Sequence, residues 1–308
     1  MPKRKIAILG STGSIGKTLL QIVEKEKTKF DILLLSADKN HNDLLKQAKK
    51  FKVKNLIITN KNSYQKIKKD KYSKKIKIFD NFDNYKKIFK KKIDYIMSAI
   101  TGIQGLNPTV DIIKYGKTIA IANKESIICG WDLIKKESIK SKTKIIPVDS
   151  EHFSIFQLLK GHRMNEIEKI YITASGGPFL NYKVNQMKYI DPKKALKHPK
   201  WKMGKKISVD SASLMNKMLE HVEAQKLFSI NPEKIKIIIH PESLVHAVIE
   251  LKNGLYKFIY HETTMLIPIL NAIFDNKVNI DDFIKPTMNK RKKIFFKNLT
   301  FLKVDIKR

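Results

Sequence analysis

The sequence contains little cysteine, little arginine and no long apolar run. Cys129 is the one cysteine among 308 residues, which excludes an internal disulfide and any zinc or iron–sulfur site built on several cysteines. No stretch approaches the roughly 20 apolar residues of a membrane span, and the first residues lack the apolar core of a secretory signal. We therefore expect a cytoplasmic protein without a membrane partner.

Arginine is scarce although the chain is strongly basic, with a formal net charge of +33. Only four of its 62 basic residues are arginines. Base readout and phosphate clamping favour the fork of the arginine side chain, whereas the lysines here are spread over every segment. We expect no nucleic-acid partner, and lysine-rich nucleic-acid binding stays open as an alternative function.

Apolar segments alternate with polar, helix-compatible stretches in the first half of the chain. The predicted strands cover residues 5–9, 30–36, 56–58, 76–78, 95–97 and 118–121. This rhythm predicts an α/β fold with a doubly wound, Rossmann-like parallel sheet. It changes after residue 148, so we expect a Rossmann-like domain over 1–148, an α+β domain over 149–280 and a lysine-rich tail over 281–308.

Three glycines follow the first predicted strand, at positions 10, 13 and 16, and a helix is predicted directly after them. Glycines at this spacing permit a tight turn and a close approach of the backbone to a pyrophosphate at the helix N-terminus. A glycine turn that binds no ligand is the alternative. Asp38, Lys39 and Asn40 end the second strand, where a Rossmann unit contacts the adenosine ribose.

An apolar run read as a strand ends in the sequence Asp149-Ser150-Glu151-His152. Alternate residues of an extended segment point to the same side, so we expect Asp149 and Glu151 to reach one point together. Mg²⁺ and Mn²⁺ prefer oxygen ligands of this kind. A pair of solvated loop acids is the alternative.

Residues 211–228 are predicted to form one helix. Its apolar stripe consists of Leu214, Met218 and Val222. An amide, a cation and a carboxylate share an arc of roughly 100° on the opposite side, namely Asn216, Lys217 and Glu220. The alternative to a functional cluster is a solvated face with an i,i+3 ion pair.

Several motifs occur in an order that carries a family resemblance. They are 10–16 (GSTGSIG), 122–126 (ANKES), 147–152 (PVDSEH), 175–179 (SGGPF), 198–204 (HPKWKMG), 209–212 (VDSA) with Asn216, Lys217 and Glu220, and 239–243 (IHPES). In this order they resemble the 1-deoxy-D-xylulose 5-phosphate reductoisomerase family. The resemblance extends over most of the chain, from residue 4 to residue 250 or so.

The resemblance implies an enzyme that depends on NADPH and on Mn²⁺ or Mg²⁺. Such an enzyme rearranges and reduces 1-deoxy-D-xylulose 5-phosphate to 2-C-methyl-D-erythritol 4-phosphate in isoprenoid precursor biosynthesis. By resemblance, the metal ligands would be Asp149, Glu151 and Glu220. The catalytic and substrate-binding residues would be Lys124, Ser150, Glu151, Ser175, His198, Trp201, Ser211, Asn216, Lys217 and Glu220. The NADPH site would consist of Thr12, Gly13, Ser14, Ile15, Lys39, Asn40, Asn123, Glu125 and Gly204.

The chain departs from the family pattern in three places. Asp38 stands where the family usually has glycine, and residues 262–269 keep only part of an arginine-containing motif. The chain ends where the family's C-terminal helical domain would begin; we expect it to be complete and to form a homodimer through the strands at 235–251 and 255–260. Another Rossmann oxidoreductase is a further alternative, for which Cys129 would have to serve as the nucleophile from within a predicted helix.

Overall fold

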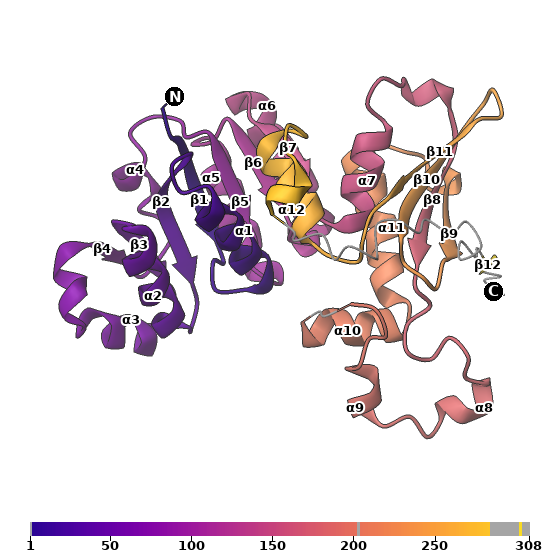
Figure 1. Cartoon of the computed structure of the whole chain (residues 1–308), viewed down its shortest axis with the longest axis horizontal. Coiled ribbons are helices and arrows are strands. Elements are labelled where there is room, and N and C mark those ends of the chain that lie inside the picture. Colours follow the sequence, from indigo (N-terminus) through magenta and orange to yellow (C-terminus); the bar gives the residue numbers. More distant parts are fainter. Residues whose placement is uncertain (1, 202–203, 284–301, 304–308) are drawn as a thin grey trace. The chain divides into compact units, whose positions relative to one another are not determined.

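The computed structural model describes residues 2–201, 204–283 and 302–303. The chain forms two compact units, each with its own sheet. The first unit comprises the chain up to Val148 together with Ile269–Val278. The second runs from Asp149 to Pro268 and continues after Val278. Figure 1 labels the elements of both.

A seven-stranded sheet forms the centre of the first unit, with the strand order β4-β3-β2-β1-β5-β6-β7. Its strands are β1 (Arg4–Leu9), β2 (Phe30–Ala37), β3 (Asn55–Ile58), β4 (Lys77–Phe79), β5 (Tyr95–Ser98), β6 (Thr118–Ile121) and β7 (Lys144–Pro147). Every pairing in it is parallel. The predicted doubly wound α/β fold is confirmed, and the strand order reverses at β1, where ligands bind in such sheets.

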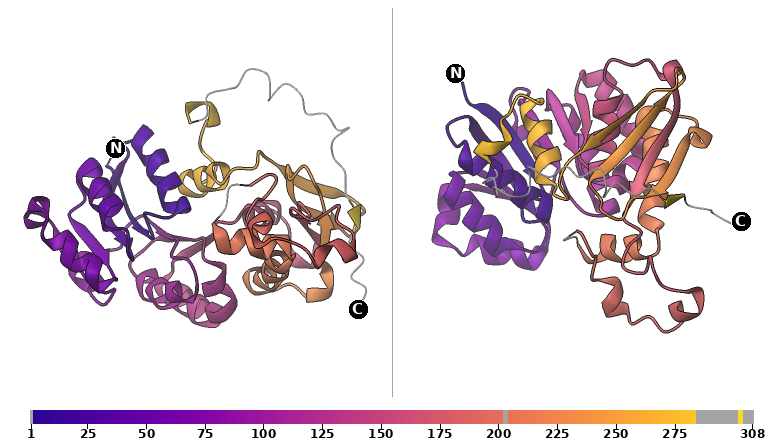
Figure 2. Two further views of the ribbon diagram at one scale, coloured as in Figure 1. Left: turned by 90° about the horizontal axis from the view of Figure 1, so that it is seen from below. Right: turned by 45° about the vertical axis from the view of Figure 1, so that its right-hand side comes forward.

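Helices connect these strands. They are α1 (Ser14–Lys25), α2 (His41–Phe51), α3 (Lys61–Lys68), α4 (Tyr85–Ile88), α5 (Leu106–Ile113) and α6 (Lys124–Ser141). A further helix, α12 (Leu266–Phe274), joins the first unit from Ile269 onward, and the Phe274 ring meets Phe30 of β2 edge-on. Figure 2 shows α12 in orange beside the indigo and purple elements of this unit. The sequence did not indicate this return of the chain.

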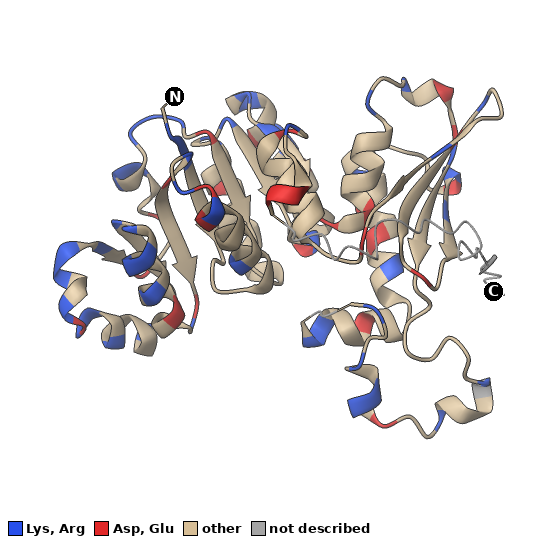
Figure 3. Cartoon of the chain, in the orientation of Figure 1, with Lys and Arg blue, Asp and Glu red and all other residues tan. Residues whose placement is uncertain are grey.

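The lysine-rich segment between Tyr64 and Lys92 contributes both to the surface and to the core of the first unit. It contains most of α3, a 3₁₀ turn, β4 and α4, and it buries Ile67, Tyr85 and Phe89. The lysines project outward while these apolar side chains pack inward. Figure 3 shows Lys and Arg distributed over many elements rather than gathered on one.

The second unit contains a mixed five-stranded sheet with the order β11-β10-β8-β9-β12. Its strands are β8 (Ile167–Ala174), β9 (Ile235–Ile239), β10 (Val245–Leu251), β11 (Tyr256–Tyr260) and β12 (Leu302–Lys303). The helices α7 (Ser150–Leu158) and α11 (Met215–Phe228) pack against it. Ile155, Ile172 and Ile249 are fully buried between them, and burying each contributes about 2 kcal/mol.

Short helices lie between β8 and α11. They are α8 (Val184–Met187), α9 (Pro192–Ala195) and α10 (Lys205–Ala212). The tail expected over 281–308 lies mostly outside the described residues. Its described part includes the two-residue strand β12, which pairs antiparallel with β9 and was not predicted.

The helix predicted over 211–228 is wrong as a single element. α10 ends at Ala212, Leu214 adopts a left-handed backbone with φ of 59°, and α11 begins at Met215. The polar arc is not solvated either, because Asn216, Lys217 and Glu220 are buried while the apolar Met218 is 48% exposed. A helix that buries its polar side needs polar partners there, and Glu151 of α7 supplies one.

Candidate metal and substrate site

Asp149 and Glu151 come together through a helix start and not through an extended strand, so that part of the sequence-based expectation is wrong. Asp149 is the N-cap of α7, and its side chain accepts hydrogen bonds from the backbone N–H groups of Glu151 (3.0 Å) and His152 (3.4 Å). Glu151 lies in the first helical turn. A carboxylate at a helix N-terminus satisfies free N–H groups and is stabilised by the helix dipole.

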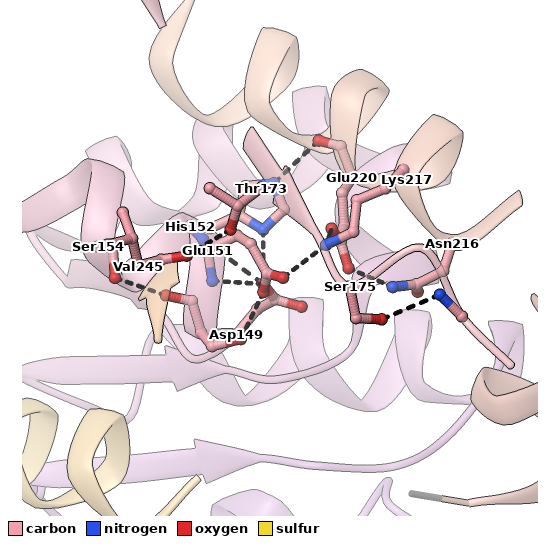
Figure 4. Close-up of polar contacts among 12 residues, drawn as sticks. Asp149, Glu151, His152, Ser154, Thr173, Ser175, Asn216, Lys217, Glu220 and Val245 are labelled. Carbon is pink, nitrogen blue, oxygen red and sulfur yellow. Dashed lines mark hydrogen bonds and ion pairs between the residues drawn. The ribbon is translucent and has the colours of Figure 1, made fainter. Parts of the chain in front are cut away.

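Glu220 reaches the same place from α11. One carboxylate oxygen each from Asp149, Glu151 and Glu220 lies within 4.8 Å of the others. Figure 4 shows these side chains converging, with Lys217 among them. The Lys217 ammonium lies 2.5 Å from Glu151 Oε1 and 2.6 Å from Glu220 Oε2. Two chain segments, the start of α7 and the first turns of α11, therefore meet at one small volume.

Electrostatics make this volume attractive to a cation. Burial, together with the neighbouring Glu220 and Asp149 carboxylates, raises the pKa of Glu151 to about 8, although Lys217 opposes the rise. Carboxylates that repel one another this strongly are stabilised by a divalent cation. Because all three donors are oxygens, the set suits Mg²⁺ or Mn²⁺ better than Zn²⁺. The residues present thus fit a hard metal ion.

His152 also links the two helices α7 and α11, although the motifs assigned it no role. His152 is fully buried, with Nδ1 3.2 Å from Asp149 Oδ1 and 3.5 Å from Glu223 Oε2. Its Nε2 lies 2.9 Å from the Glu220 carbonyl oxygen. The sequence could have indicated this contact by its spacing. Asp149 and His152 are three residues apart, as are Glu220 and Glu223, and residues at that spacing are neighbours on one side of a helix.

Ser175 and His198 form a separate polar pair in the second unit. His198 Nδ1 accepts from the Trp201 N–H at 2.9 Å, so the other ring nitrogen, Nε2, carries the proton and donates to Ser175 Oγ at 3.0 Å. Burial and the charge of Lys217 lower the pKa of His198, which keeps the ring neutral near pH 7. Because Ser175 Oγ accepts this hydrogen bond and one from the Gly177 N–H, its own hydroxyl proton can be donated to an anion, with an uncharged ring beside it.

Backbone geometry brings the Ser175 turn against the end of α10. Gly177 has φ of 68°, and a Cβ at this position would lie 2.8 Å from the Ser211 carbonyl oxygen. Its N–H donates to Ser175 Oγ at 3.2 Å. Only glycine fits this close approach, which places Ser175 near Ser211. Asn216, by contrast, directs its amide to Glu220.

Most of the remaining predicted residues lie in the first unit. Gly13 is the N-cap of α1, so Thr12, Ser14 and Ile15 flank the helix start beside the left-handed Gly10. Asn40 caps α2, with Lys39 exposed before it. Asn123 caps α6, and Lys124 and Glu125 form its first turn.

The other three predicted residues lie in the second unit. Gly204 caps α10, and the Trp201 ring meets the His246 ring edge-on at 5.9 Å. Ser150, at the first position of α7, donates from Oγ to Glu151. Cys129 is exposed within α6 and has no place in either polar cluster.

Comparison with known proteins decides the family. A sequence model described as 1-deoxy-D-xylulose 5-phosphate reductoisomerase matches residues 6–130, and one for the C-terminal domain of that enzyme matches residues 145–228. The curated reductoisomerase of Pelagibacter ubique (strain HTCC1062) is 51% identical over 307 residues, covering 98% of this chain and 77% of the relative. The chain belongs to the 1-deoxy-D-xylulose 5-phosphate reductoisomerase family. The nucleic-acid-binding and alternative-oxidoreductase hypotheses find no support.

Solved reductoisomerase structures share the fold. The enzyme from Zymomonas mobilis in complex with NADPH matches with a TM-score of 0.80 at 34% identity, covering 88% of this chain and 70% of that one. A reductoisomerase in complex with NADPH, fosmidomycin and magnesium matches with a TM-score of 0.86 at 31% identity, covering 98% and 76%. The chain thus spans about three quarters of the length of these reductoisomerases.

The family assignment does not test the expectations on location, oligomeric state and partners. Among the described residues, no helix combines the length and apolar character that crossing a bilayer requires. The cytoplasmic location, the homodimer and the lack of a nucleic-acid partner stay predictions, as do the roles of individual site residues.

Proposed function

We propose that this reductoisomerase-family chain converts 1-deoxy-D-xylulose 5-phosphate to 2-C-methyl-D-erythritol 4-phosphate, using NADPH and Mn²⁺ or Mg²⁺. The observation that carries the proposal is the convergence of Asp149, Glu151 and Glu220 within 4.8 Å. These carboxylates come from α7 and α11 and occur in a chain that is 51% identical to a curated reductoisomerase.

The three carboxylates are the proposed metal ligands. A divalent cation held there supplies Lewis-acid polarisation of the substrate's carbonyl and adjacent hydroxyl oxygens. Asp149 is held for this task by backbone N–H groups of its own helix, so its orientation does not depend on the substrate. Ser150 and Lys124 are proposed to contact the substrate near the reacting carbons.

Ser175, Ser211, Asn216 and His198 are proposed to hold the substrate phosphate. Neutral donors suit this role, because they stabilise a dianion through hydrogen bonds without the desolvation cost of buried charge. The neutral His198 ring, whose Nε2 proton faces Ser175 Oγ, fits that description. Trp201 is proposed to cover the substrate and exclude water during the rearrangement.

The first unit is proposed to bind NADPH. The N-terminus of α1 offers backbone N–H groups at Thr12–Ile15 for the pyrophosphate. Lys39 and Asn40 follow β2, where the adenosine ribose is contacted in Rossmann folds. Asn123, Glu125 and Gly204 complete the proposed cofactor site.

We also propose a homodimer built on the sheet of the second unit. β11 is an edge strand, and Tyr256, Phe258 and Tyr260 alternate along it with 37–58% of each side chain exposed. Residues i, i+2 and i+4 of a strand share one face, so three aromatic rings line one face of a strand that has a neighbour on one side only among the described residues. Such edges are usually paired or covered in native proteins.

The test of the proposed activity is oxidation of NADPH on addition of 1-deoxy-D-xylulose 5-phosphate, with and without Mn²⁺. We expect turnover only with metal. Glu220→Gln should lower turnover at least about 100-fold, because it removes a charged ligand, while NADPH binding stays close to wild type. Glu233→Gln, at an exposed acid outside the site, is the matched control. A near wild-type rate for Glu220→Gln at saturating Mn²⁺ would show that the assigned metal site is wrong.

A further inference from the structure

Lys217 occupies the centre of the carboxylate cluster. Its ammonium lies 2.5 Å from Glu151 Oε1 and 2.6 Å from Glu220 Oε2, and the residue is only 7% exposed. Both distances are those of charge-assisted hydrogen bonds. The Lys217 ammonium therefore binds one oxygen on each of two of the three carboxylates that are proposed as metal ligands.

An ammonium group and a divalent cation compete for these oxygens. Mg²⁺ requires oxygen distances of roughly 2.1 Å and a nearly octahedral shell, which leaves no room for donated hydrogen bonds on the same lone pairs. Two positive groups at this separation also repel each other strongly where water is scarce. Binding of the metal to these two oxygens of Glu151 and Glu220 thus displaces Lys217 from them.

The position of Lys217 also indicates where the ammonium would go. Lys217 follows Asn216 directly in α11. Burial is the main cause that lowers the pKa of His198, and the charge of Lys217 is the second. His198 in turn bonds Ser175. The ammonium therefore contacts the carboxylates and follows one proposed phosphate-binding residue, Asn216, in the chain, and its charge also acts on another, His198.

We propose that Lys217 is an internal counter-ion of the metal site, and that displacement by the divalent cation releases it to the substrate phosphate. This inference rests on the proposed function and adds a coupling between its two subsites. Metal binding and phosphate binding then strengthen each other, because both favour the state in which the Lys217 ammonium has left the carboxylates and contacts the phosphate. Such coupling is reciprocal by thermodynamic necessity.

The first measurement is the dissociation constant of Mn²⁺ for the full chain without substrate, by titration calorimetry or by paramagnetic resonance of free Mn²⁺. Lys217→Met removes the competing charge with a side chain of similar length, so we expect Mn²⁺ to bind about tenfold more tightly. Lys206→Met is the control, since Lys206 pairs with Asp210 at 2.7 Å on the surface of α10. That variant should bind Mn²⁺ as the wild type does.

The second measurement is the coupling between Mn²⁺ and inorganic phosphate. In the wild type, saturating Mn²⁺ should tighten phosphate binding about fivefold or more, and Lys217→Met should lose most of this effect. Lys217→Gln provides the same test if the methionine variant does not fold. The wild-type coupling can be measured without any variant.

The outcomes separate this inference from the proposed function. Unchanged or weaker Mn²⁺ binding in folded Lys217 variants, or independent binding of Mn²⁺ and phosphate in the wild type, would overturn the role of Lys217. The metal site itself would still stand if Glu220→Gln abolished the Mn²⁺ binding. Mn²⁺ binding that Glu220→Gln leaves unaltered would instead remove the metal site on which the proposal rests.

Discussion

His152 and Glu220 join the two helices that carry the proposed metal ligands. The buried imidazole lies with Nε2 2.9 Å from the Glu220 carbonyl, while Nδ1 faces Asp149 and Glu223. Since both ring nitrogens face acceptors, the ring carries two protons. Burial alone would lower the pKa of His152, but Glu223 and Asp149 raise it to about 10. His152 is therefore a charged link between α7 and α11.

The first prediction is that His152→Phe destabilises the second unit by about 3–5 kcal/mol, because it removes the buried cationic imidazole that pairs with the Glu223 and Asp149 carboxylates. Urea denaturation of the full chain measures this loss in the free energy of unfolding. The control is His162→Phe, where the pair with Glu166 at 3.2 Å is half exposed on the glutamate side and contributes less than about 1 kcal/mol. Equal effects of the two substitutions would contradict the assigned link.

The second prediction concerns acid sensitivity and a stacked histidine pair. His246 and His261 are buried, with ring centroids 3.7 Å apart, and His261 Nδ1 lies 2.8 Å from the Glu262 carbonyl. Burial lowers the pKa of His261 to about 4, and burial together with His261 lowers that of His246. Both rings are thus neutral in the folded chain at pH 6.5.

Because these pKa values are lower in the folded than in the unfolded chain, acid favours unfolding. The stabilising effect of the neutral rings is complete above about pH 6.5 and is lost as the pH falls towards 4, at up to about 1.4 kcal/mol per pH unit for each ring. His261→Phe keeps an aromatic ring that can stack on His246 but removes one titratable group. Urea denaturation between pH 6.5 and 4.5 should therefore give a shallower pH dependence for this variant. An unchanged slope would count against the buried, neutral state of His261.

The strands and the order of the site motifs could be predicted from the sequence because both depend on local patterns. Alternating apolar runs fixed the positions of β1 to β6, and Asp149, Glu151 and Glu220 were identified by motif. The way they meet was not predictable locally. Asp149 lies close to Glu151 because it caps α7. The helix break at Leu214 allows the polar side of α11 to face inward, and this burial depends on Glu151, a polar partner from another segment of the chain. The His246–His261 stack likewise joins side chains 15 positions apart across a strand pair.

The third prediction concerns cofactor choice and Asp38. This exposed carboxylate accepts a hydrogen bond from Thr59 Oγ1 at 2.9 Å and directly precedes Lys39. A negative charge near the proposed ribose site disfavours the 2′-phosphate of NADPH, whereas Lys39 favours it. We expect NADPH to be preferred, but only narrowly.

Asp38→Asn keeps an acceptor for Thr59 and removes the charge, so the preference for NADPH over NADH should rise severalfold. Asp38→Gly should act in the same direction. The ratio of kcat/KM values for the two cofactors measures this, with Asp80→Asn as the exposed control. A narrower preference in Asp38→Asn, or equal use of NADH by the wild type, would contradict the prediction.

The fourth prediction is that Phe258→Glu dissociates the proposed dimer. Phe258 pairs opposite Val248 across β10 and β11, on the same face as Tyr256 and Tyr260. Its 47% exposed ring stands in the middle of the aromatic row on the edge strand. If a second chain covers that row, a glutamate there places a charge in the middle of an apolar contact, which costs several kcal/mol.

Sedimentation velocity at micromolar concentration should therefore show a dimer for the wild type and a monomer for Phe258→Glu. Ile139→Glu is the matched control, because Ile139 is 67% exposed on α6, far along the chain from the edge strand, and its substitution should leave the dimer intact. The helical content of Phe258→Glu should equal that of the wild type, since the Phe258 side chain is 47% exposed. A wild-type monomer with full turnover would show that β11 is not a dimer edge, and dissociation by both glutamates would show that the effect is a general one of added charge.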